Sequence, residues 1–523
     1  AADAAAEVDR PGRVLIEVAS NCLYVANTGQ PFRSGGVTSL MTAHTSDKPI
    51  RTARMIGAKG LGFRAILNWT DTPLISSGAL ELGFSQRHAA AQVSDLARQS
   101  PNLAAKLSRA KSERPPLLVF PAIGTDLEDN LDPDTAAMLH HVRALRSAGY
   151  DTVVAVPFRD GGAAEKAIDQ AREFEPAFLL FVPTIREIRI QLPEEPVRNW
   201  SIAPSEEVDG DVTINLVHGA DTEIQSWILR RRKGSVVIGE ADRDYELAIA
   251  LRVDQPCGAG VLHSFFPTSL PMPFAGLFHA TLELASNRKM LEDASDLNAA
   301  VLSELGTFFA ETLDELREGE RISGDPLEWL VEHGAFPQQL KSLAQATWRR
   351  AKQLPLIRSL DGTWRTAVQS KIGPVGYASF LPQRFFGELA AVESTNAETV
   401  LRSRLEVPEI DPSELTERLR LADLSVSERA LAIVGIASTL PSIHHDRRLL
   451  LDANFRPMPK TTTPFPPPSR TDQRHSLPRW STARFISPDL WDQLLEHAKG
   501  STLREKIASL KGFRVTEFSV DSV

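Results

Sequence analysis

The chain has 523 residues with 58 Lys or Arg and 67 Asp or Glu, which gives a formal net charge of −9. That length suits roughly three domains, and the negative charge argues against a protein that coats nucleic acid. The cysteines, Cys22 and Cys257, are too few for a disulfide scaffold or a cysteine zinc site, and no apolar run is long enough to span a membrane. We therefore expect a cytoplasmic protein without a membrane partner.

The first third of the chain mixes helical and β patterns. The alanine-rich run 1–7 predicts a helix, and the β-rich runs 14–18 and 22–25, joined by a polar turn, predict a hairpin. The polar stretch 33–56 predicts a long loop with one short helix. Further elements follow in chain order: exposed helices over 86–114, a buried strand at 117–120, a helix around 134–147, a strand at 152–156, a helix over 163–175 and a strand-like alternation at 185–191.

Strand patterns dominate residues 211–288. We expect 227–229 and 236–238 to form a hairpin that turns at Lys233-Gly234. The basic run Arg230-Arg231-Arg232-Lys233 would then lie at that turn. Such a run either contacts nucleic-acid phosphates or forms a solvated edge that blocks aggregation, and the turn position favours the second interpretation.

The last 230 or so residues read as mainly helical. Residues 289–352 carry an apolar stripe that predicts a core-packed helix, and residues 412–440 predict further helices. The proline-rich segment 457–468 predicts an extended connector without regular structure. The stripe consists of Leu297, Val301, Leu305, Phe308, Phe309, Leu313 and Leu316.

Two glycine clusters suggest the chemistry of the chain. The first, residues 25–32, follows a predicted strand and contains Asn27 and Gly29; the second, residues 56–63, precedes a helix-like segment and contains Lys59. Glycine after a strand lets the backbone approach a flat ligand, and glycines that open a helix direct free N–H groups towards phosphate oxygens. Lys59 adds a positive charge for the same phosphate.

Together these clusters resemble the nucleotide-binding boxes of the GHKL ATPases, the superfamily of gyrase, MutL, histidine kinases and the ninety-kilodalton heat-shock chaperones. The run Asn27-Thr28-Gly29-Gln30-Pro31 resembles the Asp-x-Gly-x-Gly box that binds adenine. The run Gly57-Ala58-Lys59-Gly60-Leu61-Gly62-Phe63 resembles the glycine box at the far end of the ATP lid. With Ser46-Asp47-Lys48 between them, the sequence is most similar to the sacsin-type branch, over about residues 1–190.

The resemblance implies an α+β fold in three parts. Residues 1–195 would form a GHKL-type α/β sandwich that binds ATP and lacks the start of the family's first helix. Residues 196–345 would form an α/β transducer-like domain, and residues 346–523 a mainly helical, proline-linked and incomplete C-terminal region.

Carried over position by position, the resemblance implies a set of residues that contact the nucleotide. Asn27 stands where the family has Asp, and Pro31 where it has its second glycine. Because the amide oxygen of Asn27 can accept from the adenine amino group as a carboxylate does, this interpretation retains adenine binding. The set comprises Asp3, Asn27, Gly29, Lys48, Gly57, Lys59, Gly60, Leu61, Gly62, Phe63 and Thr152.

One arginine lies outside this set. Arg288 belongs to a run, residues 284–291, that resembles the middle-domain loop from which the heat-shock chaperones extend an arginine to the γ-phosphate. The resemblance therefore implies a catalytic contact for Arg288. The alternative is a solvated arginine at a strand-to-helix junction.

The resemblance also implies ATP and Mg²⁺ as cofactors. The family's first helix carries a Glu that activates water and an Asn that holds Mg²⁺, and Ala1-Ala2-Asp3-Ala4 matches only the last positions of that motif. We therefore expect both groups just upstream of Ala1, no metal ligand within this chain, and little ATP hydrolysis by it.

These implications define two classes of function. The first is an ATP-binding, ATP-hydrolysing conformational switch, chaperone-like or acting in DNA transactions or defence, with a client protein and an ATP-dependent homodimer as partners. Nucleic acid as a partner has no support of its own in the sequence. The second is a non-catalytic interaction or scaffold protein that keeps a degenerate nucleotide-binding fold.

The C-terminal region carries one weaker signal. His444-His445-Asp446 has no further ligand at metal-site spacing, so a solvated loop is expected there. Residues 441–523 hold 13 Lys or Arg against 9 Asp or Glu, an excess of four positive charges that hints at an acidic partner.

Overall fold

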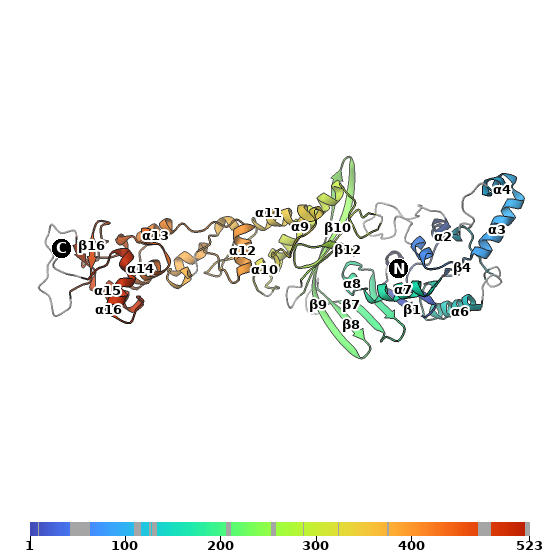
Figure 1. Cartoon of the computed structure of the whole chain (residues 1–523), viewed down its shortest axis with the longest axis horizontal. Coiled ribbons are helices and arrows are strands. Elements are labelled where there is room, and N and C mark those ends of the chain that lie inside the picture. Colours follow the sequence, from blue (N-terminus) through green and yellow to red (C-terminus); the bar gives the residue numbers. More distant parts are fainter. Residues whose placement is uncertain are drawn as a thin grey trace. The chain divides into compact units, whose positions relative to one another are not determined.

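The computed structural model divides the chain into two compact units, Ala1–Phe309 with Glu332–Gln345, and Ala310–Val331 with Ala346–Val523. Figure 1 shows the elements along the chain. The domain boundaries predicted at residues 195 and 345 stay predictions. The structure describes residues 1–8, 10–41, 63–108, 117–124, 127, 133–205, 211–252, 258–285, 287–322, 324–373, 376–468 and 483–517.

The first unit is built on a 13-stranded mixed sheet, so the predicted α+β class is confirmed. Its strand order is β12-β11-β13-β10-β9-β8-β7-β6-β1-β2-β5-β3-β4, with β1–β6 and β11–β13 parallel and the other neighbours antiparallel. The strands are β1 (Gly12–Val18), β2 (Cys22–Asn27), β3 (Leu74–Ser77), β4 (Leu80–Gly83), β5 (Thr152–Pro157), β6 (Ile185–Gln191), β7 (Arg198–Pro204), β8 (Asp211–His218), β9 (Asp221–Ile238), β10 (Ala241–Arg252), β11 (Ala259–Ser264), β12 (Phe266–Pro271) and β13 (Gly276–Ala280).

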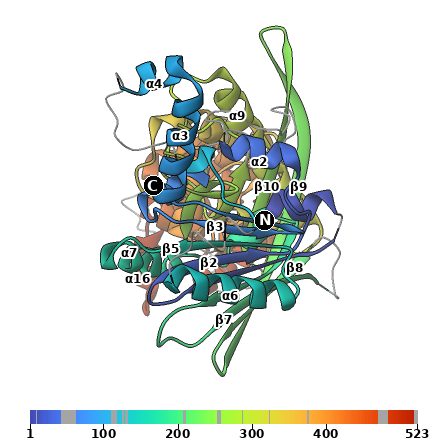
Figure 2. The ribbon, with the colours of Figure 1, turned by 90° about the vertical axis from the view of Figure 1, so that its right-hand side faces the viewer.

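Helices cover both faces of this sheet. Figure 2 shows α6 on one side of β2 and β5 and α2 on the other. The helical elements are α1 (Ala2–Glu7), α2 (Ser34–Met41), η1 (Phe63–Asn68), α3 (Gln86–Gln99), α4 (Pro101–Leu107), η2 (Leu117–Val119), α6 (Pro133–Ser147), α7 (Gly161–Arg172), α8 (Phe178–Phe181), α9 (Asp296–Glu318), η3 (Gln338–Leu340) and α11 (Lys341–Ala351), where α9 and α11 continue into the second unit.

The two faces of the sheet follow from strand alternation. Tyr24 and Ala26 of β2 and Val153 and Ala155 of β5 pack in one core cluster with Leu139 and its neighbours on α6. Because successive side chains of a strand point to opposite faces, the odd-numbered residues of β2 and the even-numbered residues of β5 face away from α6. This second face carries the candidate site described below.

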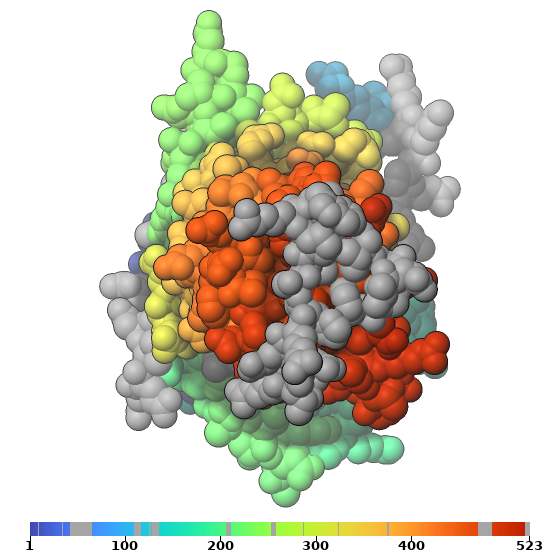
Figure 3. Space-filling view, turned by 90° about the vertical axis from the view of Figure 1, so that its left-hand side faces the viewer, coloured from blue at the N-terminus to red at the C-terminus, as the bar shows by residue number. Residues whose placement is uncertain are grey.

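The second unit is mainly helical, as expected for the C-terminal region, and Figure 3 shows its surface in orange and red. Its core joins α13, α14 and α15, with Ile433, Leu490 and Phe513 fully buried. The elements are α10 (Pro326–Trp329), β14 (Ile357–Arg358), β15 (Trp364–Arg365), η4 (Ala367–Gln369), η5 (Tyr377–Ser379), η6 (Gln383–Glu388), α12 (Thr395–Ser403), α13 (Pro412–Leu421), α14 (Val426–Thr439), η7 (Ser442–His444), η8 (Arg447–Leu449), β16 (Thr463–Phe465), β17 (Ala483–Phe485), α15 (Pro488–His497), α16 (Leu503–Ser509) and η9 (Lys511–Phe513).

Most predicted elements are confirmed, including the N-terminal hairpin, the apolar stripe of α9 and the helices α13 and α14. The predictions for two short segments are wrong. The predicted strand at 117–120 is the helical turn η2, because a four-residue apolar run does not distinguish a buried strand from a buried turn. The predicted connector 457–468 contains β16, which pairs in parallel with β17 and buries Phe465.

The predicted turn at Lys233-Gly234 is also wrong. β9 runs unbroken from Asp221 to Ile238, and it turns into β10 only at Gly239. Gly234 stays within the strand because the ring of Tyr245 occupies the space of its missing side chain: a Cβ on Gly234 would lie 2.5 Å from the tyrosine oxygen. The basic run therefore lies in the middle of a long strand and is not the solvated turn that we expected.

Two buried histidines make the stability of this unit depend on pH. His263 and His279 are neighbours on β11 and β13, and both pack against Phe181. Burial lowers the pKa of His263 to about 4 and that of His279 to about 3, from an ordinary 6.5. Below pH 6.5 the unfolded chain takes up protons that the folded chain does not, so stability falls as the pH drops towards these lower values.

We expect acidification from pH 6.5 to 5 to remove about 2 kcal/mol of unfolding free energy per buried histidine. His279→Gln should make the profile shallower by about 1.4 kcal/mol per pH unit, because glutamine does not titrate. Urea denaturation at several pH values measures this, and His218→Gln, at an exposed position, is the matched control. An unchanged slope in His279→Gln would contradict the assignment.

Candidate functional site

Three strand ends meet on the face of the sheet opposite α6. β2 ends at Asn27, β5 begins at Thr152 and β3 ends at Ser77, and the register places Asn27 and Ser77 on either side of Thr152. All three side chains are buried, and the hydroxyl oxygens of Ser77 and Thr152 are 2.6 Å apart. The result is a row of polar groups beside the aliphatic pair Val25 and Val154 on the same face.

Asn27 has the donor and acceptor groups that reading a purine edge requires. It is 8% exposed, and its amide nitrogen donates to the backbone oxygen of Thr28 over 3.1 Å. This contact orients the amide group and leaves its oxygen to accept a hydrogen bond from a ligand.

The loop after β2 is fixed on both sides. The backbone N–H of Thr28 donates to the Arg13 carbonyl oxygen over 3.0 Å, and the N–H of Gln30 donates to the Ala4 carbonyl oxygen over 2.8 Å. The N–H of Phe32 donates to the Ser77 hydroxyl oxygen over 2.9 Å. The loop therefore connects the sheet to helix α1 and is held in one conformation.

Gly29 allows the close approach of α1 to this loop. Its φ angle is +136°, in the region that favours glycine, and a Cβ at this position would lie 2.5 Å from the carbonyl carbon of Ala4. Its N–H donates to a carboxylate oxygen of Asp151 over 2.8 Å. Asp3, on the first turn of α1, is buried at 8% exposure. Asn27, Gly29 and Thr152 are thus brought together next to α1, the helix that carries Asp3.

Sequence reasoning missed two residues of this cluster, Ser77 and Asp151. The carboxylate of Asp151 accepts from Gly29 and also pairs with Arg10, so it joins the loop to the start of β1. Ser77 connects Thr152 to the same loop. The sequence offered only one signal, the position of each residue next to a strand end, because the residues that Ser77 and Asp151 contact are far away in sequence.

The second glycine cluster lies outside the described residues. The residues concerned are Gly57, Lys59, Gly60, Leu61 and Gly62. Lys48, which precedes the cluster, also lies outside the described residues, so the roles of all six stay predictions. Phe63 opens η1, and the chain after it is anchored: Arg159 pairs with Asp71 over 2.8 Å and donates to the Leu67 carbonyl oxygen over 3.0 Å.

Arg288 lies outside the sheet, in a turn between β13 and α9. It occupies a turn in which its own φ is +57°, and the Lys289 carbonyl oxygen accepts from Ser269 on β12. β12 forms one edge of the sheet, while β2, β5 and β3 lie near the other. No described contact joins Arg288 to the Asn27 cluster, and its predicted γ-phosphate contact stays a prediction.

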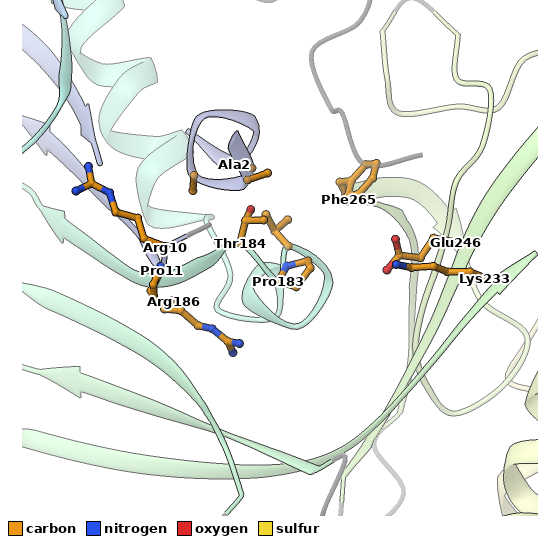
Figure 4. Close-up of a pocket in the computed structure, with 12 residues that line it drawn as sticks. Ala2, Arg10, Pro11, Pro183, Thr184, Arg186, Lys233, Glu246 and Phe265 are labelled. Carbon is orange, nitrogen blue, oxygen red and sulfur yellow. The ribbon is translucent and has the colours of Figure 1, made fainter. Parts of the chain in front are cut away.

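A cavity of about 360 Å³ lies beside α1. Ala2, Ala5 and Ala6 form one wall, and Figure 4 shows Lys233 and Glu246 entering from the opposite side beside Phe265. Arg10, which pairs with Asp151, also lines this cavity. Helix α1 therefore contacts the loop after β2 and also lines this cavity.

The basic run of β9 supplies part of that cavity. Lys233 lies directly opposite Glu246 in the β9–β10 register, and Arg231 donates to Glu246 over 3.3 Å and to the Leu180 carbonyl oxygen. Burial lowers the pKa of Arg231, although Glu246 partly offsets this. Arg230 and Arg231 are half-buried and paired with Asp211 and Glu246, so the solvated edge predicted for the run is wrong for them, whereas Lys233 is exposed.

Comparison of the sequence with models of known protein families and with individual curated proteins gives no match. Within the ranges that the structure describes, no three His, Cys, Asp or Glu side chains form a group that could hold a metal ion. Among the described helices, none combines the length and apolar character needed to cross a lipid bilayer. The functional assignment therefore depends on the polar cluster and on the resemblance noted above.

Proposed function

We propose that this chain binds ATP as a conformational-switch protein of the sacsin-like GHKL type, with a GHKL-type sandwich as its nucleotide-binding part. The observation that carries the proposal is the convergence of Asn27, Gly29, Thr152 and helix α1 at one end of the sheet. These positions are separated by up to about 150 residues in sequence, yet they match the motif positions that the resemblance assigns to one adenine site.

The chemistry of the cluster supports adenine as the bound group. A purine requires an acceptor for its exocyclic amino group, and the oriented amide oxygen of Asn27 supplies one. The buried hydroxyls of Thr152 and Ser77 provide further donors and acceptors beside it. Gly29 lets helix α1 pack directly against the loop that follows Asn27.

ATP hydrolysis with Mg²⁺ belongs to the proposal for the whole protein. The described residues contain no cluster of three His, Cys, Asp or Glu side chains that could hold a metal ion, so we assign no Mg²⁺ ligand and no chemical step to them. The functional result of nucleotide binding would be a conformational change. It would move the loop after β2, and with this loop α1 and the segment predicted to close over ATP.

We expect Asn27→Ala to weaken ATP binding at least tenfold, because it removes one buried hydrogen bond to the base. Asn27→Asp should retain ATP binding, since a carboxylate also accepts from the amino group. Calorimetric titration with up to millimolar ATP measures both. Asn102→Ala, at an exposed position on α4, is the control.

Unchanged ATP affinity in Asn27→Ala would remove this residue from the site. Lys59→Ala tests the second glycine cluster in the same assay, and we expect a similar loss there. Turnover measured on the full-length protein separates the two classes of function. ATP binding without hydrolysis would favour the scaffold interpretation, which the replacement of Asp by Asn27 already supports.

A further inference from the structure

We propose that a polar cleft in the second unit binds the phosphate group of a small phosphorylated molecule. The cleft has a volume of about 380 Å³ and lies between α13, the turns η7 and η8, and the segment that follows Met458. It contains the His444-His445-Asp446 run that the nucleotide proposal leaves unexplained. The side chains used below are Ser413, Glu417, His444, Asp446, Arg447, Arg448 and Lys460.

The carboxylates of the cleft are already neutralised. Arg448 donates to Oδ1 of Asp446 over 3.1 Å, to Oδ2 of Asp446 over 2.6 Å and to Glu417 over 3.1 Å. Glu417 also pairs with Arg420. Burial raises the pKa of Asp446, but the hydrogen bonds from Arg448 outweigh it, and the pKa is lowered overall. Two carboxylates and two guanidinium groups thus form a closed network without excess charge.

Two cations in the cleft remain outside this network. Arg447 donates to the Thr462 carbonyl oxygen, and within the part of the chain that the structure describes no carboxylate lies within ion-pair distance of it. Burial and the nearby Arg514 lower its pKa, and the charge of Asp446 offsets this only in part. Lys460 is exposed and likewise has no ion pair among the described residues. An anion placed between Arg447 and Lys460 would relieve this uncompensated positive charge.

Phosphate matches the remaining groups better than a carboxylate does. It carries close to two negative charges near neutral pH and offers three acceptor oxygens. Arg447 and Lys460 would balance the charge, and the hydroxyl of Ser413, 3.1 Å from Nδ1 of His444, is a neutral donor at the rim. The volume lies in the range of small-ligand sites, so the rest of the molecule is small.

The probe for this site is inorganic pyrophosphate, titrated into the full chain by calorimetry. Arg447→Gln and Lys460→Gln should each weaken binding at least tenfold. Arg456→Gln removes the same charge four positions from Lys460, at an exposed side chain that does not line the cleft, and should change affinity less than twofold. Arg447 and Lys460 belong to the second unit, so a loss in their variants is distinct from any effect on the nucleotide site proposed in the first unit.

Several results would overturn the inference. These are an absence of saturable binding, or equal losses in the Arg456 and Lys460 variants. Lys460 is exposed, so its variant remains informative if Arg447→Gln does not fold. A parallel titration with ribose 5-phosphate that binds more tightly than pyrophosphate would support an organic phosphate. Tighter binding of a single-stranded oligonucleotide, with the same variant pattern, would overturn a small-molecule ligand in favour of nucleic acid.

Discussion

Replacing Gly29 with alanine is expected to destabilise the first unit by about 3 kcal/mol and to abolish nucleotide binding. The new Cβ would lie 2.5 Å from the Ala4 carbonyl carbon and 2.7 Å from its oxygen, so α1 would have to move away. The φ angle of +136° adds backbone strain for any residue with a side chain. Movement of α1 or of the loop would also break the hydrogen bond from Gln30 to Ala4.

Urea denaturation followed by circular dichroism gives the stability change, and calorimetry with ATP gives the binding change. Gly161→Ala is the matched control, because Gly161 opens α7 without a positive φ and a Cβ there would meet no more distant residue within 4 Å. It should be neutral or slightly stabilising. If Gly29→Ala behaved like the control, the tight packing of α1 against the loop would be wrong.

The sequence was sufficient to predict the strand and the turn at Gly29, but not the packing of α1 against that turn. A β-rich run that ends in Asn27-Thr28-Gly29 indicates a strand followed by a tight turn, and the strand at Thr152 was predicted from its own composition. The pairing of these two strands could not be predicted, since no local signal in the sequence determines which strands become neighbours. The roles of Asp151 and Ser77 depend on that pairing, which explains why both were missed.

The basic run of β9 shows a second limit of sequence reasoning. Lysine and glycine at 233–234 are typical of a hairpin turn, but the turn lies five residues later because Tyr245 packs over Gly234. Solvent exposure was inferred from that misplaced turn. The partner that makes Arg231 an internal residue, Glu246, becomes visible only when the true register is known.

We expect Arg231→Met to lower the unfolding free energy of the first unit by about 2–3 kcal/mol. The substitution removes the partner of Glu246, which is 8% exposed, and the donor to the Leu180 carbonyl oxygen. A carboxylate left buried without its partner costs more than the pair contributed. Lys233, directly opposite Glu246, limits the loss, since it can take over part of the charge compensation.

A double substitution separates this effect from simple loss of packing. Arg231→Met combined with Glu246→Leu removes both charges, and we expect it to recover most of the stability because apolar pairs of similar volume replace buried ion pairs well. Arg243→Gln, on the exposed part of β10, is the control and should change stability by less than about 0.5 kcal/mol. If the double variant were as unstable as Arg231→Met alone, the loss would come from the hydrogen bond to Leu180 and not from the uncompensated carboxylate. The contribution of Arg231 to stability would then be the link that it makes between β9 and the backbone of α8.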